Sequence, residues 1–389
     1  MGLLSGSVSL MPYRVTGALE RLQDNDWLGQ RLTMMGFRPI DQTAEELSAG
    51  WVQLADPHAS DFVGRQDFVR DNYLCFSLRM DRRRIPGALL RQEYDLAAQA
   101  FLDSRPGMRR VPKAKREELK EQLRLSLLAR SLPVPSMVDI LLDRRSNRLW
   151  VLSLNRQALD SFETLFGKTF EGLQLAPIAP MDLAMSCLDE AEQPALQALD
   201  QARDGSFLER VEGNRWLGHD FLLWLFHRTL TTSSDYVVRR PGPGLEGAGF
   251  NAYLNDRLVL AAVDGEGRQR IAIAGPQTIF AEARTALSHG KSLEEGTLYL
   301  EKDRDQWRFT LKADRMTWSS LRCPVSAPDL DVDDQEQLAA LAEFYARTGA
   351  IEEGLQLFES LLQAFLRERI AEDWPRREGV IRNWLQQPA

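Results

Sequence analysis

The chain has 389 residues, of which 44% are hydrophobic and 27% charged, a balance typical of a folded globular protein with two or three domains. The formal net charge of −8 at first argues against a nucleic-acid partner. No apolar run approaches the roughly 18 residues that a membrane span needs, and the N-terminus lacks the basic and apolar regions of a signal peptide, so we expect no membrane association.

The negative charge is concentrated at the C-terminal end of the chain. From Val325 onward there are 13 Asp and Glu residues and 6 Lys and Arg residues, whereas residues 1–324 hold 43 acidic and 42 basic residues. The main body is therefore nearly neutral and contains basic clusters. Three widely spaced cysteines, Cys75, Cys187 and Cys323, indicate buried thiols in a reducing compartment, and we expect a cytoplasmic protein.

The N-terminal part of the chain predicts strands alternating with helices. Strands are expected at residues 7–16, 50–54 and 73–80, and helices at 18–35 and 88–102. Three arginines, Arg82, Arg83 and Arg84, follow the third strand directly. Ile85-Pro86-Gly87 then predicts a turn into the second helix.

The most distinctive stretch begins at Arg105, from which six basic residues and no acidic residue occur up to Arg116. A helix is expected over residues 112–130, with a proline at its first turn. At about 100° per residue, one stripe of this helix holds four cations, Lys113, Arg116, Lys120 and Arg124, beside a stripe of leucines. Two interpretations stay open: a presented cationic edge, or an ordinary solvated face with local ion pairs.

The second half of the chain predicts mostly strands between helices. A hairpin is expected over residues 137–154, a helix over 156–166, short helices between 181 and 204, and an apolar helix over 218–229. Residues 253–321 predict strands, with a turn at Asn255-Asp256 and one helix over 278–289, and about three helices follow Pro324. The expected class is α+β, with antiparallel sheets and a C-terminal helical extension. The expected domains are residues 1–180, 181–324 and 325–389.

No enzymatic motif stands out along the chain. Asp329, Asp331 and Asp333 lack the glycine and glutamate of a calcium loop, and His219 and His227 have no third ligand nearby in sequence. A nuclease would need gathered carboxylates, for which Asp139, Asp143 and Asp160 are available at unremarkable spacing. We expect no enzymatic activity, metal or cofactor.

The basic clusters lack interleaved aromatic residues and any recognition-helix pattern, so neither base stacking nor base readout is indicated. Cations alone predict contacts with phosphates, without sequence preference and with strong salt dependence. The candidate phosphate contacts are Arg82, Arg83, Arg84, Arg109, Arg110, Lys113, Lys115, Arg116, Lys120 and Arg124.

Several segments resemble the recombination-associated protein RdgC family. Met35-Gly36-Phe37-Arg38-Pro39 followed by Ser48-Ala49-Gly50-Trp51-Val52 is similar to its F-x-P…GWV signature. Arg84-Ile85-Pro86 lies where the family has a basic residue before Leu-Pro, and residues 113–132 resemble its basic helix. The resemblance covers about residues 7–180 well and residues 215–324 weakly but collinearly.

The resemblance implies a ring-shaped homodimer that encloses double-stranded DNA without sequence preference, associates with the nucleoid and restrains the RecA recombinase. Two departures are expected. The family's basic finger-like loop has no clear counterpart at Ala274-Gly275-Pro276-Gln277, and the residues after Pro324 are an added acidic segment. An alternative is a protein–protein interaction module that acts through its acidic C-terminal helices and has lost DNA binding.

Overall fold

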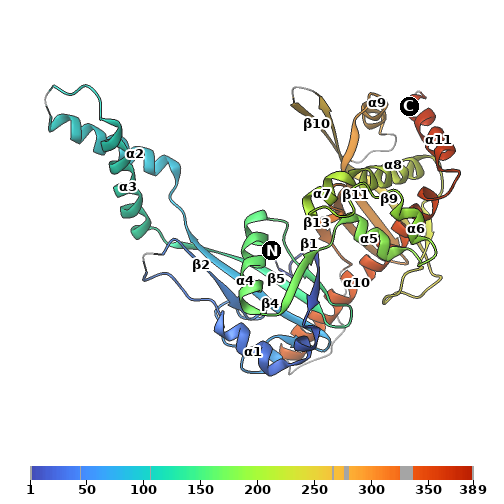
Figure 1. Ribbon diagram of the computed structural model, residues 1–389, viewed down its shortest axis with the longest axis horizontal. Coiled ribbons are helices and arrows are strands. Elements are labelled where there is room, and N and C mark those ends of the chain that lie inside the picture. The colour runs from blue at the N-terminus through green and yellow to red at the C-terminus, as the bar shows by residue number, and fades with distance from the viewer. Residues whose placement is uncertain are drawn as a thin grey trace. The chain divides into compact units, whose positions relative to one another are not determined.

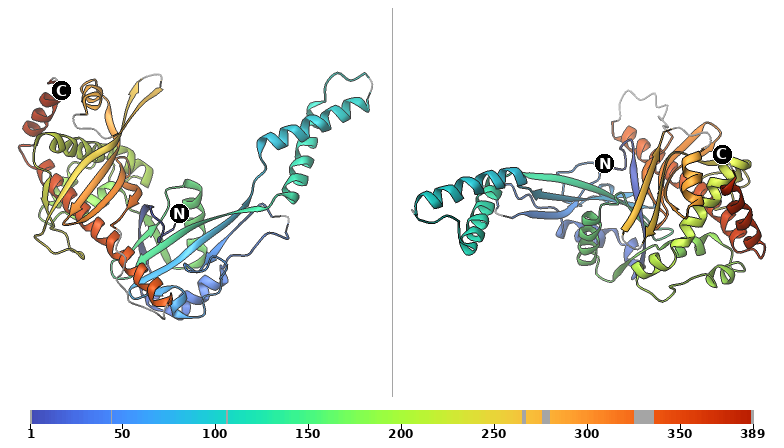
Figure 2. Two further views of the ribbon diagram at one scale, coloured as in Figure 1. Left: turned by 180° about the vertical axis from the view of Figure 1, so that it is seen from behind. Right: turned by 90° about the horizontal axis from the view of Figure 1, so that it is seen from above.

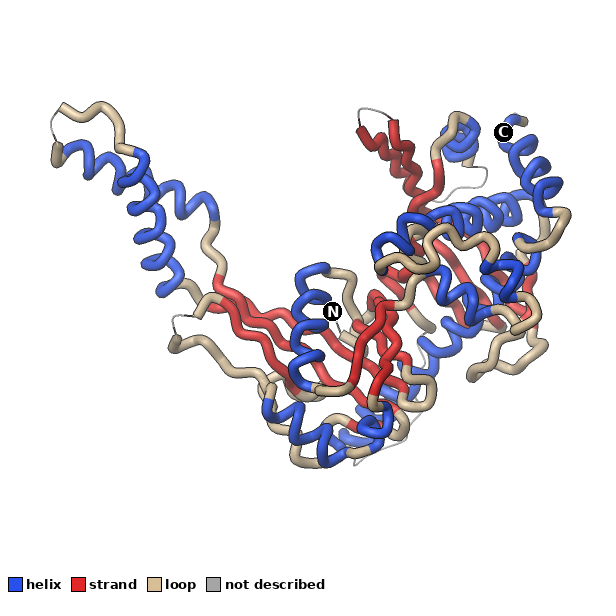
Figure 3. Tube along the Cα trace, viewed as in Figure 1, coloured by secondary structure: helices blue, strands red, loops and turns tan. Residues whose placement is uncertain are grey.

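The computed structural model describes residues 2–43, 45–105, 107–264, 267–275, 280–324 and 336–387. It confirms the α+β class, because antiparallel sheets are flanked by helices (Figure 3). The chain forms two compact units. The smaller unit comprises residues 15–147 and 155–175, and the larger unit comprises residues 1–14, 148–154 and 176–389.

The smaller unit is built on a three-stranded antiparallel sheet in the order β2–β4–β5. Its elements are η1 (Leu19–Gln23), α1 (Asn25–Met34), β2 (Leu47–Val52), η2 (Arg65–Asp67), β3 (Val69–Arg70), β4 (Tyr73–Arg83), α2 (Gly87–Asp103), α3 (Lys113–Arg130), β5 (Pro133–Asp143) and α4 (Arg156–Thr169). Trp51 on β2 anchors α4 to the sheet, because its indole N–H donates to Thr169 Oγ1 at 2.8 Å and its ring meets Phe162 edge-on.

Helices α2 and α3 form an arm that extends beyond the ends of β4 and β5 (Figures 1 and 2). No side chain of α2 is buried, and Leu128 is the buried one in α3. A helix pair with so little buried surface gains little stability from the core of its own unit. The arm therefore displays most of its side chains to its surroundings.

The larger unit contains a sheet in the order β10–β9–β11–β12–β13–β1–β6, with β8 beside β9 and β7 beside β1. Its strands are β6 (Arg148–Val151), β8 (Asp235–Val237), β9 (Gly249–Asp264), β10 (Gly267–Ala274), β11 (Ser292–Lys302), β12 (Asp305–Lys312) and β13 (Thr317–Arg322). Two further strands belong to it in part: β1 (Val8–Gly17) contributes its residues up to Arg14, and β7 (Leu173–Pro177) contributes its residues from Ala176. Its helices are α5 (Pro180–Cys187), α6 (Gln193–Gln197), α7 (Phe207–Gly213), α8 (Arg215–Thr231), α9 (Ala281–Ser288), α10 (Glu336–Arg369) and α11 (Trp374–Gln386).

Helices α8 and α10 pack on one face of this sheet through aromatic side chains. Phe358 on α10 meets Phe221 on α8 and Trp318 on β13 edge-on, and Trp318 stacks on Phe309 with ring centroids 3.8 Å apart. Six apolar residues of α10 are at most 1% exposed: Leu357, Phe358, Leu361, Leu362, Phe365 and Leu366. Helix α10 is thus part of the core of the larger unit.

The two units differ from the domain boundaries expected at residues 180 and 324. Met11 on β1 pairs with Val151 on β6, so an N-terminal strand and the middle of the chain belong to one unit. The C-terminal helices belong to the same unit because α10 supplies its core. The described residues after Pro324 form two helices, where about three were expected. The acidic residues Asp329, Asp331 and Asp333 lie outside the described residues.

The expected turn at Asn255-Asp256 is a bulge within one continuous strand. Asp256 has a positive φ of 63°, yet β9 continues from Gly249 to Asp264. The register with β11 shifts there, because Gly296 pairs with Leu258 while Leu298 pairs with Leu254. The extra residues on β9 are absorbed locally, and the strand resumes its pairing.

Candidate nucleic-acid interface

The cations at the far end of the arm are exposed. Arg109 and Arg110 lie in the connection between α2 and α3, and Lys113 begins α3. Arg105 lies over the ring of Phe101, 4.9 Å from its centroid. Within the part of the chain that the structure describes, no carboxylate lies within ion-pair distance of these four cations. This end of the arm is therefore uncompensated positive charge.

The cations further along α3 have local partners. Lys115 pairs with Glu118 at 2.6 Å, and the ammonium of Lys120 lies 5.4 Å from the ring centroid of Tyr94 on α2. Arg116 reaches the carbonyl of Val111 at 3.5 Å and remains exposed. In the predicted stripe, Lys113 at the start of α3 therefore has no carboxylate partner among the described residues, whereas Lys120 in the middle contacts an aromatic ring.

Arg124 is the last cation of the stripe, and it forms an ion pair with Glu46, a residue distant in the sequence. Its guanidinium lies 2.8 Å from the carboxylate of Glu46, which immediately precedes β2, and 3.9 Å from Glu121. Both partners in the first pair are about half exposed, so the pair contributes at most about 1 kcal/mol to stability. It nevertheless competes with any phosphate for Arg124.

The three consecutive arginines after the expected strand have different environments. Because β4 continues to Arg83, neighbouring side chains alternate between its faces. Arg82 is exposed, with one guanidinium nitrogen 3.4 Å from Gln157 Oε1, and Arg84 is exposed in the connection to α2. Arg83 is only 7% exposed and donates to backbone carbonyls. Arg83 is therefore not available to a phosphate, whereas Arg82 and Arg84 are exposed.

Apolar side chains are exposed at the base of the arm. Leu132 is 81% exposed and Val134 is 57% exposed, at the joint between α3 and β5. Val134 and Leu47 pair with Arg82 from opposite sides across the sheet, so the three side chains share one face. Leu47 is 52% exposed. This joint is an apolar surface beside a cation.

A second projecting element, made of β9 and β10, occurs just before α9. The sequence predicted no basic finger-like loop at this point. Strands β9 and β10 form a two-stranded ribbon at the edge of the larger unit's sheet (Figure 1). Arg270 and Arg257 on the ribbon both pair with Glu295, at 2.7 and 3.6 Å, and Lys291 donates to Gln269 at 3.2 Å. The expected position at Ala274-Gly275 falls at the end of this ribbon, and residues 276 and 277 lie outside the described residues.

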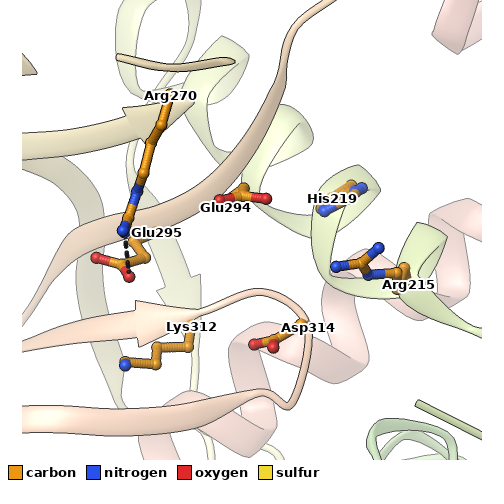
Figure 4. A pocket seen from close by; sticks show the side chains of 7 residues that line it. All are labelled: Arg215, His219, Arg270, Glu294, Glu295, Lys312 and Asp314. Atoms are coloured by element: carbon orange, nitrogen blue, oxygen red, sulfur yellow. Dashed lines mark hydrogen bonds and ion pairs between the residues drawn. The ribbon is translucent and has the colours of Figure 1, made fainter. Parts of the chain in front are cut away.

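A polar pocket of about 170 Å³ lies beside the ribbon (Figure 4). It is lined by Arg215, His219, Arg270, Glu294, Glu295, Lys312 and Asp314. Arginine and lysine side chains face carboxylates there, and Arg270 is already bound to Glu295. Charges of both signs therefore balance in this pocket, which distinguishes it from the end of the arm.

The carboxylates considered for a nuclease are not brought together. Asp139 is buried and accepts a hydrogen bond from Ser77 Oγ at 2.7 Å, whereas Asp143 accepts from Ser146 and Arg145 at the turn after β5. Asp160 is exposed on α4, 3.9 Å from Arg156. In the described ranges, no three His, Cys, Asp or Glu side chains are grouped so that they could hold a metal ion.

The remaining sequence candidates are structural. His219 lines the polar pocket, and His227 meets the ring of Trp384 edge-on at 5.0 Å, which separates the two histidines. All three cysteines are buried free thiols, and burial raises the pKa of Cys75 and of Cys187 to about 12. Among the helices that the structure describes, none has the length and apolar character to span a bilayer.

Comparison with known proteins agrees with the resemblance carried by the motifs. Residues 9–190 match the family model described as "RdgC: Putative exonuclease, RdgC". The resemblance to the RdgC family is confirmed over these residues. A curated protein named Recombination-associated protein RdgC, from Psychromonas ingrahamii, is 26% identical over 207 residues. The aligned part covers 52% of this chain and 65% of that relative, less than two thirds of the relative's length. The RdgC-like segment contains the whole arm.

Proposed function

We propose that this protein binds double-stranded DNA without sequence preference, through the uncompensated cations at the end of the arm, and takes part in recombination. The observation that carries the proposal is the group Arg105, Arg109, Arg110 and Lys113, which is exposed and lacks a carboxylate partner among the described residues. Exposed cations of this kind displace counterions from a duplex and bind its phosphates whatever the base sequence. Arg116 extends this surface along α3, whereas Arg82 and Arg84 are further exposed candidates at the base of the arm.

The homodimer is a further part of the proposal. A two-fold dimer brings two arms to one duplex, and closing a ring around DNA needs two self-complementary interfaces. The exposed joint at Leu132 and Val134 supports one of them, because such an apolar surface gains stability when a second copy covers it. A closed ring on DNA would limit the access of RecA to that DNA, which is the role we propose in the nucleoid.

The test is duplex affinity measured over a salt series from 50 to 200 mM. Changing Arg109, Arg110, Lys113 and Arg116 to Glu together removes up to four contacts per protomer. We expect the slope of log affinity against log salt to fall by about 3 to 4 for each protomer bound, and the affinity to fall by at least about 100-fold. Unchanged binding would contradict the proposal.

A matched control reverses four exposed cations elsewhere in the chain, Arg14, Lys168, Arg304 and Arg376. It changes the net charge by the same amount, so it separates local phosphate contact from overall charge. We expect it to weaken binding much less than the arm variant. The arm variant should also lose the ability to slow RecA-catalysed strand exchange on the same duplex.

The family description leaves exonuclease activity to be tested. End-labelled duplex is incubated with the protein and magnesium, and we expect the label to remain on full-length DNA.

The alternative of a protein–protein interaction module stays open as well. Retention on a DNA column separates a DNA-binding protein from a module that has lost DNA binding. Removing residues 325–389 is not a usable variant for that test, because α10 belongs to the core of the larger unit.

A further inference from the structure

Arg83 on β4 binds two separate backbone segments at the base of the arm. Its guanidinium donates to the carbonyls of Ile40 at 2.7 Å and of Asp41 and Thr43 at 3.1 Å, all in the loop before β2. It also donates to Leu128 at 3.2 Å and to Ser131, which ends α3. A single buried side chain on β4 therefore holds both a loop of the smaller unit's body and the last turn of the arm.

One of these contacts reaches a carbonyl in the last turn of α3, that of Leu128. The last carbonyls of a helix have no partner within the helix and carry the negative end of its dipole. A buried cation is stabilised there without a carboxylate, because several carbonyl oxygens surround it. Arg83 thus acts as a cap that comes from the neighbouring strand, and its geometry fixes where α3 ends relative to β4.

The arm has few other attachments to the body of its unit. It joins the sheet through the connections at Arg84–Pro86 and Ser131–Leu132, and through the exposed Arg124–Glu46 ion pair. An 18-residue helix such as α3 is about 27 Å long, so a tilt of 10° at its base moves its far end by about 5 Å. The cations of the arm lie at that far end.

We propose that Arg83 is a positioning residue, which sets the direction of the α2–α3 arm by binding the end of α3 and the loop at residues 40–43 together. The inference deepens the proposed function, because a correctly directed arm would bring Arg109, Arg110 and Lys113 to the phosphates. Arg83 itself touches no DNA. The direction of the arm can be measured without DNA, so the two proposals can fail separately.

The experiment measures the distance between two spin labels on the full chain. The labels are placed on cysteines introduced at exposed positions, Ala100 on α2 and Lys168 on α4. The native cysteines are all buried, which directs labelling to the introduced thiols. The unsubstituted protein, carried through the same labelling, shows how much label the native thiols take up.

The distance distribution is compared between the doubly labelled protein and its R83A variant. We expect a narrow distribution with Arg83 and one at least twofold broader, or clearly shifted, with Ala. The matched control is R144A, which removes another arginine that donates to backbone carbonyls, those of Leu22 and Asp71. That control should leave the distribution narrow. A narrow, unshifted distribution in folded R83A would overturn the inference.

R83K covers the case in which R83A does not fold. A lysine reaches fewer carbonyls with one ammonium, so an intermediate width is expected, whereas a width equal to the unsubstituted protein would contradict the inference. Duplex affinity of the folded variant is then measured, with a loss of at least about fivefold expected. A redirected arm with unchanged affinity would support the role of Arg83 and instead contradict the proposed DNA surface.

Discussion

Arg124 and Glu46 form an ion pair 2.8 Å long between α3 and the segment just before β2, although they are 78 residues apart in sequence. The pair has two consequences. It ties the middle of the arm to the body of the smaller unit, and it removes one cation from the edge that we propose for DNA.

Changing Glu46 to Gln frees Arg124 for a phosphate. We expect duplex binding to tighten about two- to threefold and the salt slope to steepen by about 0.9, as for one added phosphate contact. The free energy of unfolding should change by less than about 1 kcal/mol, because the pair is exposed. A filter-binding or anisotropy titration at several salt concentrations measures both. E171Q, which removes the exposed partner of Arg31 away from the arm, should leave binding unchanged.

Changing Leu132 to Asp places a charge in the proposed dimer contact. Burying a leucine is worth about 1.5 to 3 kcal/mol, so we expect the dimer dissociation constant to rise at least about 30-fold. Sedimentation velocity over a concentration series measures this constant. L245D is the control, since Leu245 is 77% exposed in a loop of the larger unit. Equal effects of the two changes would count against the joint as an interface.

Changing Phe365 to Ala tests whether α10 belongs to the core. Phe365 is fully buried and meets Phe221 and Trp374 edge-on, so its loss should cost about 3 to 5 kcal/mol. Leu338 on the same helix is 49% exposed, and L338A should cost less than about 1 kcal/mol. Guanidinium unfolding followed by tryptophan fluorescence gives both values. Similar small costs would mean that α10 is dispensable.

Two buried groups that ionise only at alkaline pH, the Tyr236 hydroxyl and the Cys187 thiol, predict a loss of stability as the pH rises. Burial raises the pKa of the Tyr236 hydroxyl to about 12, and burial together with the nearby Glu359 raises the pKa of Cys187 to about 12. Both groups stay neutral in the folded protein while the unfolded chain ionises from about pH 9 to 10. Stability is therefore complete below pH 9 and falls as the pH rises toward 12.

The measurement is the free energy of unfolding at pH 8, 10 and 11. Y236F and C187A remove the two ionising groups, and the fall between pH 8 and 11 should be shallower in each. R14Q, which changes an exposed charge, should keep the original slope. If none of the variants alters the fall in the free energy of unfolding between pH 8 and 11, other groups cause the loss of stability at alkaline pH.

Local patterns were sufficient to predict the two helices of the arm, but not that they project from the sheet. Pro112 before Lys113, the spacing of the leucines and the absence of Gly or Pro within residues 113–130 all favour a helix, and α3 begins and ends where expected. The exposed cations at its start were likewise visible in the sequence. A run of like charges that no acid interrupts needs no tertiary information to be recognised.

The role of Arg83 could have been anticipated only with the correct strand length. The strand was expected to end at Met80, which left the three arginines as an undivided basic turn. Because β4 continues to Arg83, the period of two places Arg83 opposite Arg82 and Arg84. The carbonyls that it binds are at least 40 residues away in the sequence, and no local pattern indicates them.

The division into units could not be predicted from composition. The acidic residues after Val325 suggested a separate segment, but the apolar residues of α10 face the sheet of the larger unit. Tertiary packing outweighed the change in charge as a boundary signal. Gly17 shows the same limit on a smaller scale: a Cβ there would lie 2.2 Å from the carbonyl oxygen of Gly172, a contact between residues distant in the sequence.

The interleaving of the two units along the chain sets an order for their folding during synthesis. Every residue of the smaller unit has left the ribosome once residue 175 is free. The larger unit holds residues 1–14 from the beginning of the chain, yet its core waits for Phe358 to Leu366. Domains tend to fold as units while the chain grows. The arm is thus complete on a folded support while strand β1 still lacks the helix that covers its sheet. A nascent chain would expose that sheet until Phe358 to Leu366 are made.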